Sequence, residues 1–217
     1  MKAKASLIKQ EAELTVTKNE IEAFFDGIIP DFVKQAGGIL SDTVRSWRFS
    51  NQVRIIKQAD AIVQSSGLSK QRVPLKVIYP LLENASFEED ESMQTKWAKL
   101  LANAATGSAK VFPNYIELLK QLTPIEASLL DKIYDEAMQE QDYEKRKTKQ
   151  YSKELVCKAY SITSEDFDVM IENLFRLGLC QAPGSTGIMF GTARVALRTT
   201  DVFEITSLGI SFVRACR

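Results

Sequence analysis

The chain has 217 residues, of which 45% are hydrophobic, and its 28 basic and 28 acidic residues give a formal net charge of zero. This length can bury one large core or two small ones, and we expect two subdomains. The balanced charge gives no general attraction to nucleic acid or to an anionic bilayer, so either contact would need a local patch.

The sequence contains no histidine, and this excludes several enzymatic mechanisms. Ser-His-Asp and Cys-His catalysis, HExxH metal sites and histidine pH switches all need an imidazole. The glycines form neither a GxxxxGK[ST] nor a GxGxxG phosphate loop. We therefore predict that the protein is not an enzyme, with no catalytic, metal-binding or cofactor-binding residues, no cofactor and no indicated small-molecule substrate.

Three cysteines, Cys157, Cys180 and Cys216, are far apart and odd in number. They predict neither a disulfide framework nor a zinc site, because both need closely spaced or paired cysteines. Reduced thiols are typical of the cytosol, so we expect a cytoplasmic protein. Residues 1–18 are polar and of mixed charge, and they contain no apolar stretch suited to a signal peptide or a membrane span. We expect this segment to be poorly ordered.

From Ile21 to Leu40, apolar residues keep helical spacing across Pro30 and form a broad aromatic stripe. Amphipathic helices usually bury such a face within their own domain, so the stripe predicts core packing against the helix that carries Trp97. The alternative is a segment that inserts into a bilayer and disrupts it. The acidic polar face of the stripe disfavours this alternative, because helices that bind membrane surfaces are rich in Lys and Arg.

A long helix is predicted from Ser41 or Asp42 to Ser66, and Gly67 suits its C-terminal cap. Its basic and aromatic residues form one cluster: Arg45, Trp47, Arg48, Phe49 and Arg54. Such a cluster can stack bases and hold phosphates, but a nucleic-acid site needs a much larger positive surface. We favour an interhelical packing site formed by Arg45, Trp47 and Arg48, in which the two guanidinium groups pair with the acidic residues 88–91.

The stretch 73–107 is dense with helix signals and predicts a helical hairpin. Ser86 and Glu89 predict a capping box, so the second helix should begin near Phe87, and Gly107 should end it. Its apolar face follows helical spacing: Met93, Trp97, Leu100, Leu101 and Ala104.

The run Glu88-Glu89-Asp90-Glu91 is the tightest carboxylate cluster. Carboxylates in a first helical turn interact with the helix dipole, each contributing about 0.3 to 1 kcal/mol when exposed. Only Glu88 and Glu91 share a helix face, which is too few ligands for a Mg²⁺ or Ca²⁺ site. We therefore favour a capping role over a metal site.

A second subdomain is predicted to follow a short helix after Pro113. The residues 123–126 form a capping box with proline at the first helical position. The run 139–150 loses apolar periodicity and predicts a solvated helix end or loop. Its basic part, Lys145-Arg146-Lys147 with Lys149, is offset by the preceding Glu140, Asp142 and Glu144, so we favour a solvated surface over a nucleic-acid arm.

The segment from Ser152 to the end has the signal order of a winged helix. Its predicted elements are a helix at 152–160, a helix capped by Thr163-Ser164 and ended by Gly178, wing strands at 179–181, 194–198 and 202–205, and a last helix after Thr206-Ser207.

A winged helix suggests DNA binding, and the charge of its second helix tests that suggestion. This helix carries four carboxylates and a single basic residue, Arg176. The carboxylates are Glu165, Asp166, Asp168 and Glu172. They would repel phosphate, and the wing adds only Arg194 and Arg198. We therefore favour a role in protein interaction or packing.

Four stretches of the chain are distinctive: RSWRFSNQVRIIKQAD, ENASFEEDESMQTKWAKLLANA, the LTP of Leu122-Thr123-Pro124, and ITSLGISFVRAC. Together they resemble the abortive-infection alpha (Abi-alpha) family of bacterial phage-defence proteins, and the likeness runs from about Ser41 onward. The resemblance implies a mostly helical bacterial protein that limits phage spread, commonly at the cost of the infected cell. It supplies no catalytic motif.

The sequence thus predicts a mainly α protein with a helical bundle at 19–112 and a winged-helix-like α+β domain at 113–217. We expect an anti-phage, abortive-infection protein that acts through protein contacts, with a phage or host component or a second copy as the partner. The alternatives are a winged-helix transcriptional regulator that binds DNA and a membrane-disrupting effector that uses residues 21–40.

Overall fold

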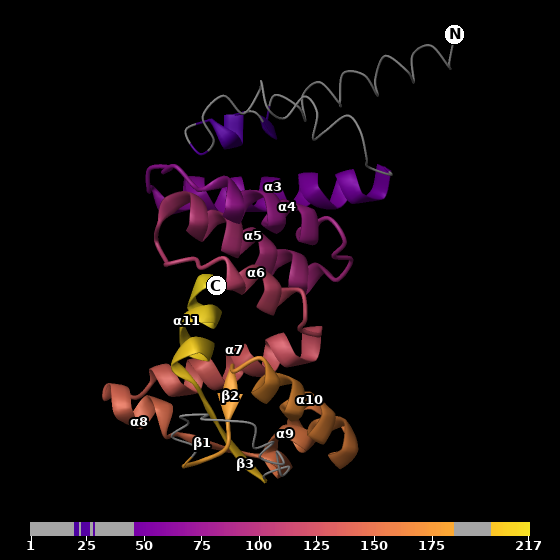
Figure 1. Cartoon of the computed structure of the whole chain (residues 1–217), viewed down its shortest axis with the longest axis vertical. Coiled ribbons are helices and arrows are strands. Elements are labelled where there is room, and N and C mark those ends of the chain that lie inside the picture. Colours follow the sequence, from indigo (N-terminus) through magenta and orange to yellow (C-terminus); the bar gives the residue numbers. More distant parts are fainter. Residues whose placement is uncertain (1–19, 22, 27, 29–45, 185–200) are drawn as a thin grey trace, which may run out of the picture. The chain divides into compact units, whose positions relative to one another are not determined.

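The computed structural model describes residues 20–21, 23–26, 28, 46–184 and 201–217. These residues are mainly helical and include one three-stranded antiparallel sheet (Figure 1). The mainly α prediction is therefore confirmed. Two compact units divide the chain: Met1–Lys120 with Ala215–Arg217, and Gln121–Arg214. The predicted domain limits at 112 and 113 stay a prediction.

The first unit contains α3 (Ser46–Ser66), α4 (Leu75–Ala85), α5 (Glu91–Thr106) and α6 (Asn114–Leu119). Helices α3 and α5 pack against each other, and α4 contacts both. The predicted apolar face of α5 is buried and forms the centre of this core, with Trp97 its largest side chain. Gly67 follows α3 with a φ of 66°, as predicted, whereas the predicted start of that helix at Ser41 or Asp42 lies outside the described residues.

The described part of the aromatic stripe is core. Ile21, Phe24, Phe25 and Ile28 are all buried. The carbonyl oxygen of Ile28 accepts a 3.1 Å hydrogen bond from the N–H group of Val73. The predicted core role is thus confirmed for these four side chains, and the rest of the stripe, to Leu40, lies outside the described residues.

The predicted capping box at Ser86 is wrong. Ser86 ends α4, and its hydroxyl donates to the carbonyl oxygen of Glu83 at 2.6 Å. Helix α5 begins four residues later than expected, because Asp90 provides the N-terminal cap and accepts from the N–H groups of Ser92 and Met93. A carboxylate satisfies these free N–H groups better than a hydroxyl that is already engaged. Gly107 ends α5 with a φ of 71°, as predicted.

The second unit contains the sheet and the remaining helices. Its elements are α7 (Pro124–Met138), α8 (Tyr143–Lys147), β1 (Gln150–Ser152), α9 (Lys153–Tyr160), α10 (Ser164–Arg176), β2 (Cys180–Gln181), β3 (Val202–Ile205) and α11 (Ser207–Ala215), which belongs to this unit as far as Arg214. The strand order is β1-β3-β2, and Tyr151 lies opposite Phe203 while Cys180 lies opposite Ile205. Phe167 of α10 packs beside the Phe203 ring in the core.

Local signals placed the helix ends of this unit well. Thr123 and Glu126 form the predicted capping box, with Pro124 at the first helical position. Thr163 caps α10, and Gly178 follows that helix with a φ of 70°. Strand β1 was not predicted, because its three residues adjoin a charged run that we expected to be solvated as a whole. That run also contains the short helix α8, none of whose residues is buried.

Candidate functional site

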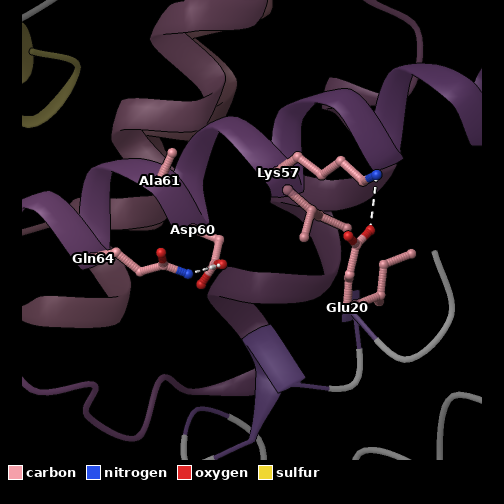
Figure 2. Close-up of a pocket in the computed structure, with 7 residues that line it drawn as sticks. Glu20, Lys57, Asp60, Ala61 and Gln64 are labelled. Carbon is pink, nitrogen blue, oxygen red and sulfur yellow. Dashed lines mark hydrogen bonds and ion pairs between the residues drawn. The ribbon is translucent and has the colours of Figure 1, made fainter. Parts of the chain in front are cut away.

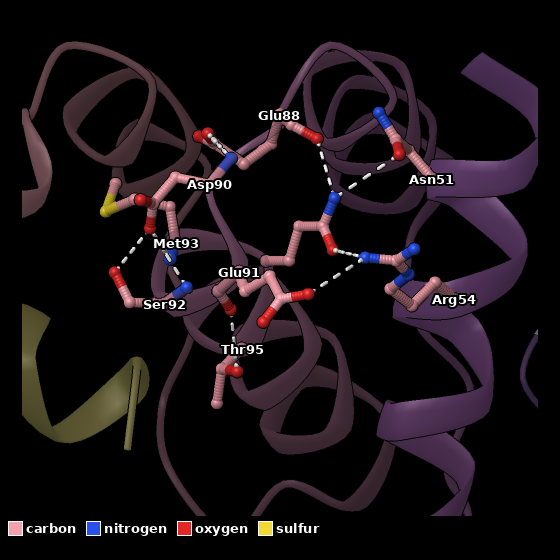
Figure 3. Close-up of polar contacts among 9 residues, drawn as sticks. Asn51, Arg54, Glu88, Asp90, Glu91, Ser92, Met93 and Thr95 are labelled. Carbon is pink, nitrogen blue, oxygen red and sulfur yellow. Dashed lines mark hydrogen bonds and ion pairs between the residues drawn. The ribbon is translucent and has the colours of Figure 1, made fainter. Parts of the chain in front are cut away.

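A polar network joins α3 to the start of α5 (Figure 3). Its centre is Gln94, a residue that is only 1% exposed. The Gln94 Nε2 group donates to the Glu88 carbonyl oxygen at 2.8 Å and to Asn51 Oδ1 at 3.3 Å. Its Oε1 atom accepts from Arg54 at 3.3 Å, and the same guanidinium lies 3.6 Å from the Glu91 carboxylate. Both ends of the buried amide are therefore used for structure.

This network includes one member of the basic and aromatic cluster. Arg54 pairs with Glu91 of the acidic run. The packing site predicted from Arg45, Trp47 and Arg48 lies outside the described side chains and stays a prediction. The side chain of Phe49 also lies outside them.

The acidic run serves the start of α5. Glu88 Oε1 accepts from the N–H groups of Glu89 and Asp90, both at 3.1 Å. Hydrogen bonds from the Ser92 hydroxyl and from the Met93 N–H group lower the pKa of the Asp90 carboxyl. These contacts support the capping role. Within the described ranges, no group of three or more His, Cys, Asp or Glu side chains is placed to hold a metal ion.

A pocket of about 150 Å³ lies beside α3, where Glu20 approaches that helix (Figure 2). Lys57 pairs with Glu20 at 2.8 Å, and Gln64 donates to Asp60 at 2.5 Å. Lys70 approaches the same Asp60 carboxylate at 3.6 Å. The charged groups of this pocket pair with one another, so we assign the pocket a structural role.

The outward face of α10 carries negative charge and apolar surface. Glu165 and Glu172 are exposed, and Val169 is 66% exposed. On the neighbouring helix α9, Leu155 is 67% exposed. We call these four residues the α9–α10 face. Exposed apolar side chains mark an interaction surface where they form one patch with a polar rim.

The remaining charged residues of α10 have partners within the second unit. Asp168 pairs with Lys153 at 2.5 Å, and Asp166 accepts from Thr163 in a capping box. Arg176 donates to Gln121 Oε1 at 3.1 Å and to Asn173 Oδ1 at 2.6 Å. The single basic residue of the helix is thus engaged within the unit. Arg194 and Arg198 of the predicted wing lie outside the described residues.

None of the three cysteines forms a disulfide. Cys180 and Cys216 are buried, and burial raises the pKa of the Cys180 thiol. The partly exposed Cys157 thiol donates to the Thr163 carbonyl oxygen at 3.7 Å. This agrees with the prediction that the cysteines form no disulfide framework.

The described helices also bear on membrane contact. None of them combines the length and the apolar character that a bilayer crossing needs.

The fold defines a mainly helical class of protein with a small antiparallel sheet in its second unit. The profile of the family described as abortive infection alpha matches residues 49–216. The chain therefore belongs to the abortive infection alpha family, as the sequence resemblance implied. No curated protein and no solved structure matches the chain significantly.

Proposed function

We propose that this protein is a non-enzymatic, bacterial anti-phage protein of the cytoplasm that causes abortive infection through protein contacts. Membership of the abortive infection alpha family supports the defence role. The α9–α10 face supports the mode of action, because these two helices offer two exposed apolar side chains and two exposed carboxylates that form no ion pair within the described residues. The partner that fits this face carries basic residues around an apolar anchor.

A winged-helix fold for the second unit is part of this proposal. The element order from α7 to β3 supports it, as does the sheet order β1-β3-β2. In this arrangement α10 occupies the position of the helix that reads DNA in winged-helix regulators. Its exposed carboxylates would repel a phosphate backbone, so we assign the exposed face to a protein partner.

Infected cells provide the test. Val169→Lys and Leu155→Lys place a positive charge on an exposed face without disturbing the core, so both variants should fold normally. We expect each variant to restore phage plaquing and survival of infected cells toward the level of cells without the protein. Ile125→Lys is the matched control, since Ile125 is an exposed apolar residue of α7 in the same unit. If Val169→Lys and Leu155→Lys protect cells against phage as well as Ile125→Lys does, the α9–α10 face has no role in defence.

The first alternative is a winged-helix transcriptional regulator. The sheet order favours it, whereas the charge of α10 does not. Its signature would be duplex binding that weakens with salt and with Arg194→Ala and Arg198→Ala. Absence of binding at low salt would remove it.

The second alternative is membrane disruption by residues 21–40. Burial of Phe24 and Phe25 disfavours it, because insertion would require their release from the core. Liposome leakage that is abolished by Phe24→Asp would support it, and leakage that survives this change would exclude the stripe as the cause.

A further inference from the structure

A groove of about 390 Å³ lies in the first unit, between the segment that leads into α4 and the end of α5 with the loop that follows it. Its floor is apolar and includes the buried side chains of Val73, Val77 and Ala104. This volume falls in the range of about 300 to 1,000 Å³ that is usual for small-molecule sites. The groove is thus large enough for a ligand and has an apolar surface to contact it.

The charged residues that line the groove all have the same sign. Arg72, Lys76 and Lys110 line it, and no carboxylate does so among the described residues. All three are exposed, and none of them forms an ion pair within the described part of the chain. Lys110 instead lies over the Phe112 ring, 4.8 Å from its centroid. Three cations around one cavity without a counter-charge produce a local positive field in a chain whose net charge is zero.

The backbone adds to this field. Helix α4 begins beside the groove, after Pro74, and no side chain caps its N-terminus. The first N–H groups of a helix lack partners within the helix and carry the positive end of its dipole. The polarity of the helix end therefore has the same sign as that of Lys76, which belongs to the first turn of α4.

One wall of the groove is held in place by Gln71. Its backbone N–H group donates to the Ala105 carbonyl oxygen at 2.7 Å, and its side-chain Nε2 group donates to the Ala104 carbonyl oxygen at 3.4 Å. Gly107 permits this packing, since a Cβ atom there would lie 2.5 Å from Gln71 Nε2. The backbone next to Arg72 is thus tied to the end of α5.

We propose that this groove binds an organic phosphate, meaning a small molecule that joins phosphate groups to a flat or apolar moiety, as a nucleotide does. The cations bind the phosphate oxygens through charge-assisted hydrogen bonds, and the apolar floor contacts the remainder of the ligand. This assignment goes beyond the proposed defence role, because it adds a small-molecule site on the unit that does not carry the α9–α10 face. The sequence did not indicate it, since Lys110 is far along the chain from Arg72 and Lys76 and the three cations form no phosphate-loop motif.

Calorimetric titration of the full chain at low ionic strength tests the site, with ATP, pyrophosphate and inorganic phosphate as probes. We expect ATP to bind most tightly and its affinity to fall as salt is added. Lys76→Glu and Lys110→Glu should each weaken ATP binding by about tenfold or more, the usual effect of losing a hydrogen bond to a charged group. Lys132→Glu is the matched control, because Lys132 is an exposed lysine of α7 that lines no part of the groove.

Three results would overturn the assignment. They are absence of ATP binding, equal ATP affinity in the groove variants and the wild-type protein, and an equal loss of affinity in the Lys132→Glu control. If inorganic phosphate binds as tightly as ATP, the claim that the groove also recognises the organic part of the ligand is wrong. Circular dichroism of each variant checks the fold, and Arg72→Gln gives an independent test by removing a charge without reversing it.

Discussion

Gln94 shows how a single buried side chain can organise two helices. Its amide accepts from Arg54 of α3 and donates to the loop before α5, so it fixes both the distance and the register of this helix pair. Buried amides with both ends satisfied favour one packing arrangement, because every alternative leaves a polar group without a partner.

Replacement of Gln94 by Leu should destabilise the protein by about 1 to 3 kcal/mol, because the Glu88 carbonyl loses its donor and Arg54 loses an acceptor. Urea unfolding monitored by tryptophan fluorescence measures this change. The control is Gln64→Leu, in which an exposed amide of α3 is removed and the loss should stay within about 0.5 kcal/mol. Equal stability of the Gln94 variant and the control would show that the network contributes nothing.

Gly209 of α11 lies close to the backbone of Leu179, the residue before β2. A Cβ atom there would lie 2.3 Å from the Leu179 carbonyl oxygen. Gly209→Ala should therefore destabilise the second unit by about 1 to 3 kcal/mol, the usual cost of overpacking a core. Alanine is favoured over glycine in a helix by about 1 kcal/mol, so the expected sign is the reverse of simple helix propensity. An increase in melting temperature would contradict the close contact.

At the scale of elements, two helix starts depend on ionised carboxylates. Asp90 caps α5, and Asp166 completes the capping box of α10. Hydrogen bonds from the Ser92 hydroxyl and from the Thr163 hydroxyl, respectively, are the main causes that lower the pKa of these two groups in the folded protein. A lowered folded pKa means that each carboxylate stabilises the fold above its unfolded pKa, and that this stabilisation is lost as the pH falls through the folded pKa.

We therefore expect the melting temperature to fall on acidification below the ordinary aspartate range, partly because these caps protonate. The double variant Asp90→Asn, Asp166→Asn keeps acceptor oxygens but cannot titrate, so its melting temperature should depend less on pH in that range. Thermal unfolding followed by circular dichroism between neutral and acidic pH measures both proteins. Identical pH profiles would show that the two caps do not contribute to the pH dependence.

Elements whose ends carry a strong local signal could be predicted from the sequence. Gly67, Gly107 and Gly178 adopt positive φ values after helices, and the Thr123 capping box depends on residues three apart. Ser86 misled the prediction, because it has the right chemistry for a cap but its hydroxyl already bonds to the preceding turn. Strand β1 was missed since its three residues become a strand only by pairing with β3, which is distant in sequence.

At the scale of the whole molecule, the sequence did not reveal which distant residues come together in the fold. Lys110 joins Arg72 and Lys76 at the groove from a distant part of the chain, and Gln94 lies on the buried side of α5 without a local sign of its role. The family, in contrast, was recognisable from a few characteristic stretches, and its profile covers both compact units. Family membership and site chemistry thus come from different kinds of evidence.

The two units also divide the proposed roles. The second unit carries the α9–α10 face for a protein partner, and the first unit carries the groove for an organic phosphate. The two proposals can fail separately, because Val169→Lys lies outside the groove and Lys76→Glu lies outside the α9–α10 face.

The efficiency of phage plaquing, measured together with the survival of infected cells across a diverse phage panel, tests the central claim most directly. Cells with the wild-type protein should show reduced plaquing and early death after infection by at least part of the panel. Trp97→Ala removes the largest side chain of the first core at a cost of about 3 to 5 kcal/mol, so it should abolish both effects. Unchanged plaquing and survival against every phage, with the wild-type protein present and folded, would contradict a role in abortive infection.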